Sequence, residues 1–201
     1  MATIHWESAG PLVVTSLAIM GSPGPATISL TAAGSAYGIR PSLTYLLGII
    51  AGTTIVLMAV ATGITATLMA FPPLRAILIV TSAVYILWLA YHVATAPPLT
   101  AKVTVTDAPS LVGGTFLGVA NPKAWVAIAA VFASAHLADT APSDAAAKIG
   151  VLTVMIILIC TTWLIAGASL ARLLRDPRSA RFINVILAGA MVCATGIAIL
   201  R

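Results

Sequence analysis

Two short stretches of the sequence hold the residue types that could bind a small polar solute. Residues 21–25 read Gly-Ser-Pro-Gly-Pro and residues 121–123 read Asn-Pro-Lys, and each stretch interrupts a long apolar run. Proline removes a backbone donor and clashes with the preceding turn, so we expect a helix to stop near Gly21 and to restart at about Pro25. The restarted half-helix would point its partially positive N-terminus into a cavity, where a carboxylate could bind.

The first stretch also offers hydroxyl groups. Ser22 and Thr27 can add them to a site built around Pro23 and Pro25. Gly24 lies between the two prolines, and we expect it to give the backbone the freedom to turn there. Inside a bilayer, backbone groups freed by such a break are tolerated only against protein or water, so the break predicts a polar cavity. The alternative is a proline kink that only shapes helix packing.

The second stretch brings a full charge. A lysine at the centre of a bilayer costs about 2.5–3.5 kcal/mol on insertion scales, so it is rarely found there without a use. Lys123 could neutralise an anionic group of a substrate or cycle a proton. Asn121 can cap the half-helix that starts at Pro122 and offers both a donor and an acceptor. The alternative is that a span begins near Pro122 and that Lys123 only reaches out to the membrane interface.

The composition places both stretches in a membrane protein. Of the 201 residues, 60% are hydrophobic and only 7% are charged, whereas a soluble domain carries about 25% charged residues. The bilayer must therefore be the solvent for most of the exterior. The net charge of +5 is not a nucleic-acid signature, because the arginines between residues 172 and 181 lie together between two apolar runs, as in a cytoplasmic loop.

Six apolar runs must position the two stretches. They cover about residues 11–33, 42–69, 74–95, 111–135, 148–171 and 182–200, and each is long enough to cross the hydrocarbon. We therefore expect an all-α, polytopic membrane protein with a single domain over residues 1–201. A first repeat (1–95) and a second repeat (111–201) would be joined by a connecting loop (96–110), and residues 136–147 would form a further polar loop.

The two halves are expected to be inverted relative to each other, because three spans per half is an odd number. Spans one and four would be broken at corresponding positions, 98 residues apart (121 minus 23). Inverted repeats with broken helices are typical of the midplane sites of transporters. The orientation follows from the lysines and arginines. Loops after spans one, three and five hold six of them (Arg40, Lys102, Arg172, Arg175, Arg178 and Arg181), and the other side holds three (Arg75, Lys148 and Arg201). This predicts a cytoplasmic location for the first set and both termini outside.

Glycine pairs predict close contacts between helices. Gly48 and Gly52 form a Gly-x-x-x-Gly pair in the second run, and Gly114 and Gly118 form another in the fourth. The first pair is followed by two threonines, Thr53 and Thr54, which could line a pathway.

In these motifs the chain resembles the LysE/RhtB family of amino-acid exporters. The resemblance rests on Pro23-Gly24-Pro25, on the glycine pair of the second span, on Asn121-Pro122-Lys123, and on six spans in 201 residues. It implies efflux of amino acids or related metabolites across the cytoplasmic (inner) membrane of a bacterium, driven by the proton or membrane gradient. The chain departs from the family at Thr53, where members often carry an acidic residue. This departure favours a neutral substrate over lysine or arginine.

The function that we expect is therefore a secondary exporter that works in the lipid bilayer on a small molecule, by alternating access between its halves. Its predicted substrate-binding residues are Ser22, Pro23, Gly24, Pro25, Thr27, Thr53, Thr54, Asn121, Pro122 and Lys123. Because no run holds a carboxylate and the histidines are scattered near span ends, we do not expect an enzyme. We also expect no metal site and no cofactor, and the placement of the arginines argues against a nucleic-acid partner. A non-transporting scaffold and efflux of a different solute or an ion are the alternatives, and homo-oligomers are left open.

Overall fold

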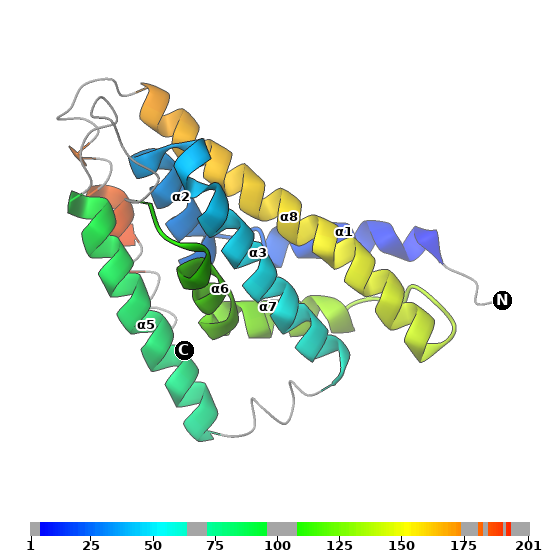
Figure 1. The fold of residues 1–201 in the computed structure, drawn as a ribbon. Coiled ribbons are helices and arrows are strands. Elements are labelled where there is room, and N and C mark those ends of the chain that lie inside the picture. The colour runs from blue at the N-terminus through cyan, green and yellow to red at the C-terminus, as the bar shows by residue number, and fades with distance from the viewer. Residues whose placement is uncertain are drawn as a thin grey trace.

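Helices make up most of the described part of this computed structural model, which comprises residues 5–63, 72–95, 108–173, 181–182, 185–190 and 192–193. After the short 3₁₀ helix η1 (Trp6–Ser8), the helices are α1 (Ala9–Ile19), α2 (Pro25–Tyr37), α3 (Ile39–Ala61), α5 (Pro72–Thr95), α6 (Leu111–Ala120), α7 (Pro122–Ala133) and α8 (Ala141–Leu173). In Figure 1 the long helices α3, α5 and α8 slant the same way, and α1 and α7 run across that direction.

Both helix breaks expected from the prolines are present. α1 ends at Ile19 and α2 begins at Pro25, and α6 and α7 meet at Asn121 with a bend of 60°. In both cases a proline is the first residue of the second half-helix, where its missing N–H is not needed and its φ angle already suits a helix. Each pair of half-helices corresponds to one interrupted apolar run of the sequence.

The membrane-crossing capacity of the described residues is concentrated in the long helices. By length and composition, Ile39–Ala61 and Ala141–Ser169 can each cross a bilayer, and α6 with α7 adds a third, bent span. Ala9–Ile19 and Ala83–Thr95 are shorter apolar helices. Most of the connecting loop (96–107), most of the arginine-rich loop (174–180) and about half of the sixth run lie outside the described residues. The inverted arrangement of six spans therefore stays a prediction.

The exposed sides of α5 and α8 are apolar. Val80, Val84 and Leu87 of α5 and Val154 and Leu158 of α8 are all more than half exposed. They recur three to four residues apart, so each helix presents a continuous apolar stripe outward. Such stripes on the outside suit lipid as the surrounding solvent.

The polar loop expected at residues 136–147 is wrong in its second half, because α8 already begins at Ala141. Pro142 fits the first turn of a helix, and the backbone N–H of Asp144 donates to the carbonyl of Thr140 at 2.9 Å. One turn further on, the Asp144 carboxylate lies 2.7 Å from the ammonium of Lys148. Lys148 is only 3% exposed, so the charge is neutralised inside the protein and the helix extends through the polar residues.

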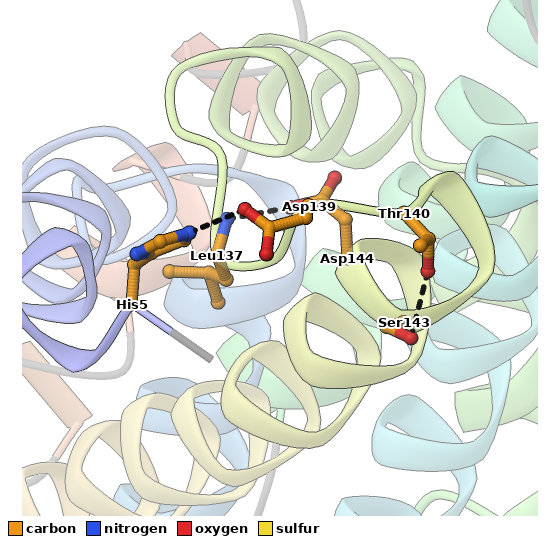
Figure 2. Close-up of polar contacts among 6 residues, drawn as sticks. All are labelled: His5, Leu137, Asp139, Thr140, Ser143 and Asp144. Atoms are coloured by element: carbon orange, nitrogen blue, oxygen red, sulfur yellow. Dashed lines mark hydrogen bonds and ion pairs between the residues drawn. The ribbon is translucent and has the colours of Figure 1, made fainter. Parts of the chain in front are cut away.

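The segment between α7 and α8 is tied to the N-terminal end of the described chain (Figure 2). Nε2 of His5 lies 2.8 Å from Oδ1 of Asp139, and the N–H of His5 donates to the carbonyl of Leu137 at 2.8 Å. The N–H of Leu137 in turn donates to the carboxylate of Asp144. The hydrogen bond to Asp139 and the charge of that carboxylate raise the pKa of His5 from its ordinary value of 6.5.

The two Gly-x-x-x-Gly pairs pack against each other, which confirms the expected close contacts and identifies their partner. A Cβ added to Gly48 would overlap the carbonyl oxygen of Leu111, and one added to Gly52 would overlap that of Thr115. From the other side, a Cβ on Gly118 would lie 2.8 Å from the backbone N of Thr53. α3 and α6 therefore meet backbone to backbone. This contact places Thr53 near the C-terminal end of α6, which Asn121 follows.

A second close pair joins α2 to α8. A Cβ on Gly34 of α2 would overlap the carbonyl oxygen of Leu164, and one on Gly167 of α8 would overlap that of Thr31. α3 and α8 also contact each other, and α5 packs on α2, α6 and α7. The described core thus contains two glycine-packed helix pairs, α3 with α6 and α2 with α8.

Candidate functional site

Lys123 joins the two helix breaks. Its ammonium donates to the carbonyl of Ser22, to the hydroxyl of Ser22 at 2.8 Å, and to the carbonyl of Pro23 at 3.1 Å. An ammonium group has three donors, so these bonds use all of them. The carbonyls follow the C-terminal end of α1, where the helix dipole favours a positive charge. The side chain therefore lies across the first break.

Asn121 and Trp125 hold the second break. Oδ1 of Asn121 accepts from the N–H of Lys123 at 3.1 Å, so Asn121 caps α7 as expected. Nε1 of Trp125 donates at 2.7 Å to the carbonyl of Val119. Near the C-terminal end of a helix, carbonyls lack an intrahelical partner, and the indole N–H supplies one here.

The first break is held in a similar way. Nε1 of Trp163 in α8 donates to the carbonyl of Gly21 at 3.2 Å, and the hydroxyl of Ser22 donates to the carbonyl of Ile19 at 2.8 Å. On the other side of the break, the N–H of Gly24 donates to the hydroxyl of Thr27 at 2.9 Å. The backbone groups that the prolines free are thus paired with protein, as a break inside a membrane requires.

Gly24 is needed for space, which corrects the expectation that it supplies freedom to turn. Its φ and ψ angles of −170° and 178° are extended, a conformation that any residue before a proline readily adopts. A Cβ at this position would instead lie 2.6 Å from Cδ and 2.9 Å from Nζ of Lys123. The absence of a side chain at Gly24 lets the lysine lie flat against the first break.

A cavity lies beside the two breaks. It has a volume of about 50 Å³, several times the roughly 10–15 Å³ that one water needs. Its polar lining comes from Gly24, Thr27, Thr53, Asn121 and Lys123, and its apolar lining from Met20, Ala26, Ala124, Ala127, Ile128, Ile156, Ile159 and Cys160. The described lining contains no carboxylate.

Two polar side chains of this lining have hydrogen-bonding capacity to spare. Asn121 is 4% and Thr53 is 9% exposed, and within the described residues neither the amide nitrogen of Asn121 nor the hydroxyl of Thr53 has a hydrogen-bond partner. The hydroxyl of Thr27, in contrast, is engaged with the backbone of Gly24. Both residues line the cavity, so its polar end is suited to a ligand or to ordered water.

The structure brings together most of the residues predicted for the site. Five of them line the cavity, Ser22 and Pro23 hold the lysine, and Pro25 and Pro122 start the half-helices. Thr54 is half-buried and is not among the lining residues. Sequence reasoning missed the contributions of Trp163, Ile156 and Cys160, because α8 is an uninterrupted apolar helix whose sequence does not mark which face is turned to the breaks.

Apolar helices, two breaks that contact each other and a partly polar cavity are features of a helical membrane protein with an internal site, the class to which membrane transporters belong. The family model described as LysE type translocator matches residues 17–201, so the chain belongs to the LysE type translocator family. This confirms the resemblance drawn from the motifs. No curated protein and no solved structure matches the chain.

Proposed function

We propose that this protein exports small neutral amino acids, or metabolites with the same charged groups, across the cytoplasmic membrane. Export would be driven by the proton or membrane gradient, with both termini outside. The observation that carries the proposal is the ammonium of Lys123 bound across both breaks, next to a cavity in which Asn121 and Thr53 have unpaired polar atoms. A scaffold without transport gives no reason for a charged side chain and free polar groups to line a cavity.

The lining chemistry supports a neutral zwitterion as substrate. Lys123, the amide of Asn121 and the hydroxyl of Thr53 are donors that suit a carboxylate. The wall formed by Ala127, Ile128 and neighbouring apolar residues suits a small apolar side chain. A second positive charge on the substrate would find no carboxylate among the described lining residues, and burying an unpaired charge is unfavourable.

The two glycine-packed pairs are the bodies that we propose to move during transport. The cavity takes Thr53 and Asn121 from the α3–α6 pair and Thr27, Ile156 and Cys160 from the α2–α8 pair, so it lies between them. Backbone-to-backbone contacts make each pair rigid, whereas the helix breaks are places where the chain can bend. Rocking of one pair against the other would open the cavity to one side of the membrane at a time.

Efflux from loaded cells tests this function. Cells with and without the gene are loaded with a panel of labelled amino acids, and the rate of release is measured for the wild type, for Lys123→Ala and for Arg40→Ala, which removes an exposed positive charge away from the cavity. We expect one or more neutral amino acids to leave faster with the wild type and with Arg40→Ala, but not with Lys123→Ala. The exporter proposal fails if no solute leaves faster, and the site assignment fails if Lys123→Ala exports normally.

A further inference from the structure

We infer that Lys123 is an internal cation that occupies, in the empty protein, the place of the substrate's amino group. On binding, the ammonium of the substrate takes over the acceptors at Ser22 and Pro23, and the Lys123 side chain turns to the substrate's carboxylate. This inference rests on the proposed export of a zwitterion and assigns a separate subsite to each of its two charged groups.

The amino subsite is defined by the present partners of Lys123. Two backbone carbonyls and one hydroxyl surround Nζ, all within 3.1 Å. A primary ammonium on a substrate has the same three donors as lysine, so it fits the same acceptors. The carbonyls of Ser22 and Pro23 belong to the break itself, and they need a donor in every state of the protein.

The carboxylate subsite is defined by the donors that remain unpaired. The amide nitrogen of Asn121 and the hydroxyl of Thr53 line the same cavity as the Lys123 side chain. When the substrate displaces Lys123 from Ser22 and Pro23, the freed ammonium becomes a third donor for the substrate's carboxylate. Each charged group at the site is then paired, which lowers the cost of holding it there.

Charge conservation separates a zwitterion from simpler ligands. A zwitterion adds no net charge. Its ammonium takes the acceptors at Ser22 and Pro23 from Lys123, and its carboxylate becomes the new partner of Lys123. An amine without a carboxylate would leave the displaced lysine unpaired, and an acid without an amine would leave the carbonyls of the break unpaired when Lys123 turns to it. Substrate binding would thus break the bond between the two helix breaks, and release would let Lys123 restore it.

The test uses two probes that each carry one charged group. Binding of L-alanine, ethylamine and propionate to the purified full-length protein is measured by calorimetry for the wild type, Lys123→Met and the control Arg40→Met. The wild type is expected to bind ethylamine much more weakly than L-alanine. In Lys123→Met the amino subsite is vacant, so we expect ethylamine to bind about tenfold or more tightly than to the wild type, and propionate binding to be lost, while Arg40→Met matches the wild type. Ethylamine binding that is no tighter in folded Lys123→Met than in the wild type overturns the inference.

If Lys123→Met does not fold, a milder variant tests the assignment of the two subsites. Ser22→Ala removes one acceptor of the amino subsite and leaves the backbone carbonyls in place. We expect the ratio of L-alanine affinity to propionate affinity to fall by several-fold. For L-alanine the loss of the hydroxyl affects the empty and the bound protein alike, whereas turning Lys123 to propionate costs less once Lys123 has lost this acceptor. An unchanged ratio overturns the inference. Absence of efflux for every amino acid would instead defeat the proposed function, whereas normal efflux with unchanged probe preferences defeats only the assignment of the subsites.

Discussion

The ammonium of Lys123 lies 2.8 Å from the hydroxyl oxygen of Ser22, although 101 residues separate them in the sequence. This contact joins the break between α1 and α2 to the break between α6 and α7. It brings a charge, two half-helix N-termini and the polar end of a cavity to one place.

Gly24→Ala tests the close approach of the lysine to the first break. The added Cβ would lie 2.6 Å from Cδ of Lys123, so the flexible end of the lysine must shift, and we expect its ammonium to lose at least one of its present acceptors. A hydrogen bond to a charged group is worth about 1.5–3 kcal/mol, and we therefore expect export to fall by about tenfold or more. Gly10→Ala is the matched control, because no atom lies within 4 Å of the added Cβ. Equal export by the two variants would contradict the role given to Gly24.

Gly52→Ala tests the backbone contact between α3 and α6. The new methyl group overlaps the carbonyl oxygen of Thr115, which cannot move without a shift of α6. Overpacking of this kind costs about 1–3 kcal/mol, so the melting temperature of the detergent-purified protein should fall.

The control for this contact is Gly150→Ala on α8, where the added Cβ meets nothing within 4 Å. Alanine is favoured over glycine in a helix by about 1 kcal/mol, so we expect this variant to melt at the wild-type temperature or above it. A Gly52→Ala protein that melts no lower than Gly150→Ala would show that the contact is not tight.

Thr53→Asp tests the neutral preference proposed for the substrate. Aspartate would place a negative charge in a cavity whose described lining has none, and this charge would attract a cationic side chain. In a competition assay of efflux, we expect lysine and arginine to gain by about tenfold or more relative to neutral amino acids. Thr53→Asn has a similar shape without the charge and should not show the gain. Unchanged preference in Thr53→Asp would remove the argument based on the missing carboxylate.

His5→Gln tests the pH dependence of the contact with Asp139. The pKa of His5 is raised in the folded protein, so the contribution of its protonated form to stability is fully present below pH 6.5 and is lost as the pH rises through the raised pKa. We expect the difference in melting temperature between the wild type and His5→Gln to be largest at low pH and to shrink at high pH. A difference that is the same at every pH would show that the ionic contact contributes nothing.

The breaks could be predicted from the sequence because proline acts locally, through its own ring and its missing N–H. Pro25 and Pro122 start half-helices in the structure as they were expected to. The capping role of Asn121 was equally local. The need for a glycine at position 24 could not be predicted in this way, because it depends on the side chain of Lys123, about a hundred residues away in the sequence.

The start of α8 and its share of the cavity could not be predicted for a related reason. Polar residues such as Asp144 indicate a loop when they are read singly, but the ion pair of Asp144 with Lys148 neutralises the charge within the helix. Which face of α8 meets the breaks is decided by the packing of Gly34 and Gly167 against the opposite backbones. Such pairings depend on the tertiary structure, and the apolar sequence of α8 is compatible with several of them.

The two indole groups that hold the carbonyls of Gly21 and Val119 give the protein a built-in optical reporter. Indole emission responds to the polarity and hydrogen bonding around the ring, and Trp163 and Trp125 account for two of only four tryptophans. Any rearrangement of either break alters the surroundings of one of these fluorophores. The transport cycle can therefore be followed by the intrinsic fluorescence of the unlabelled protein.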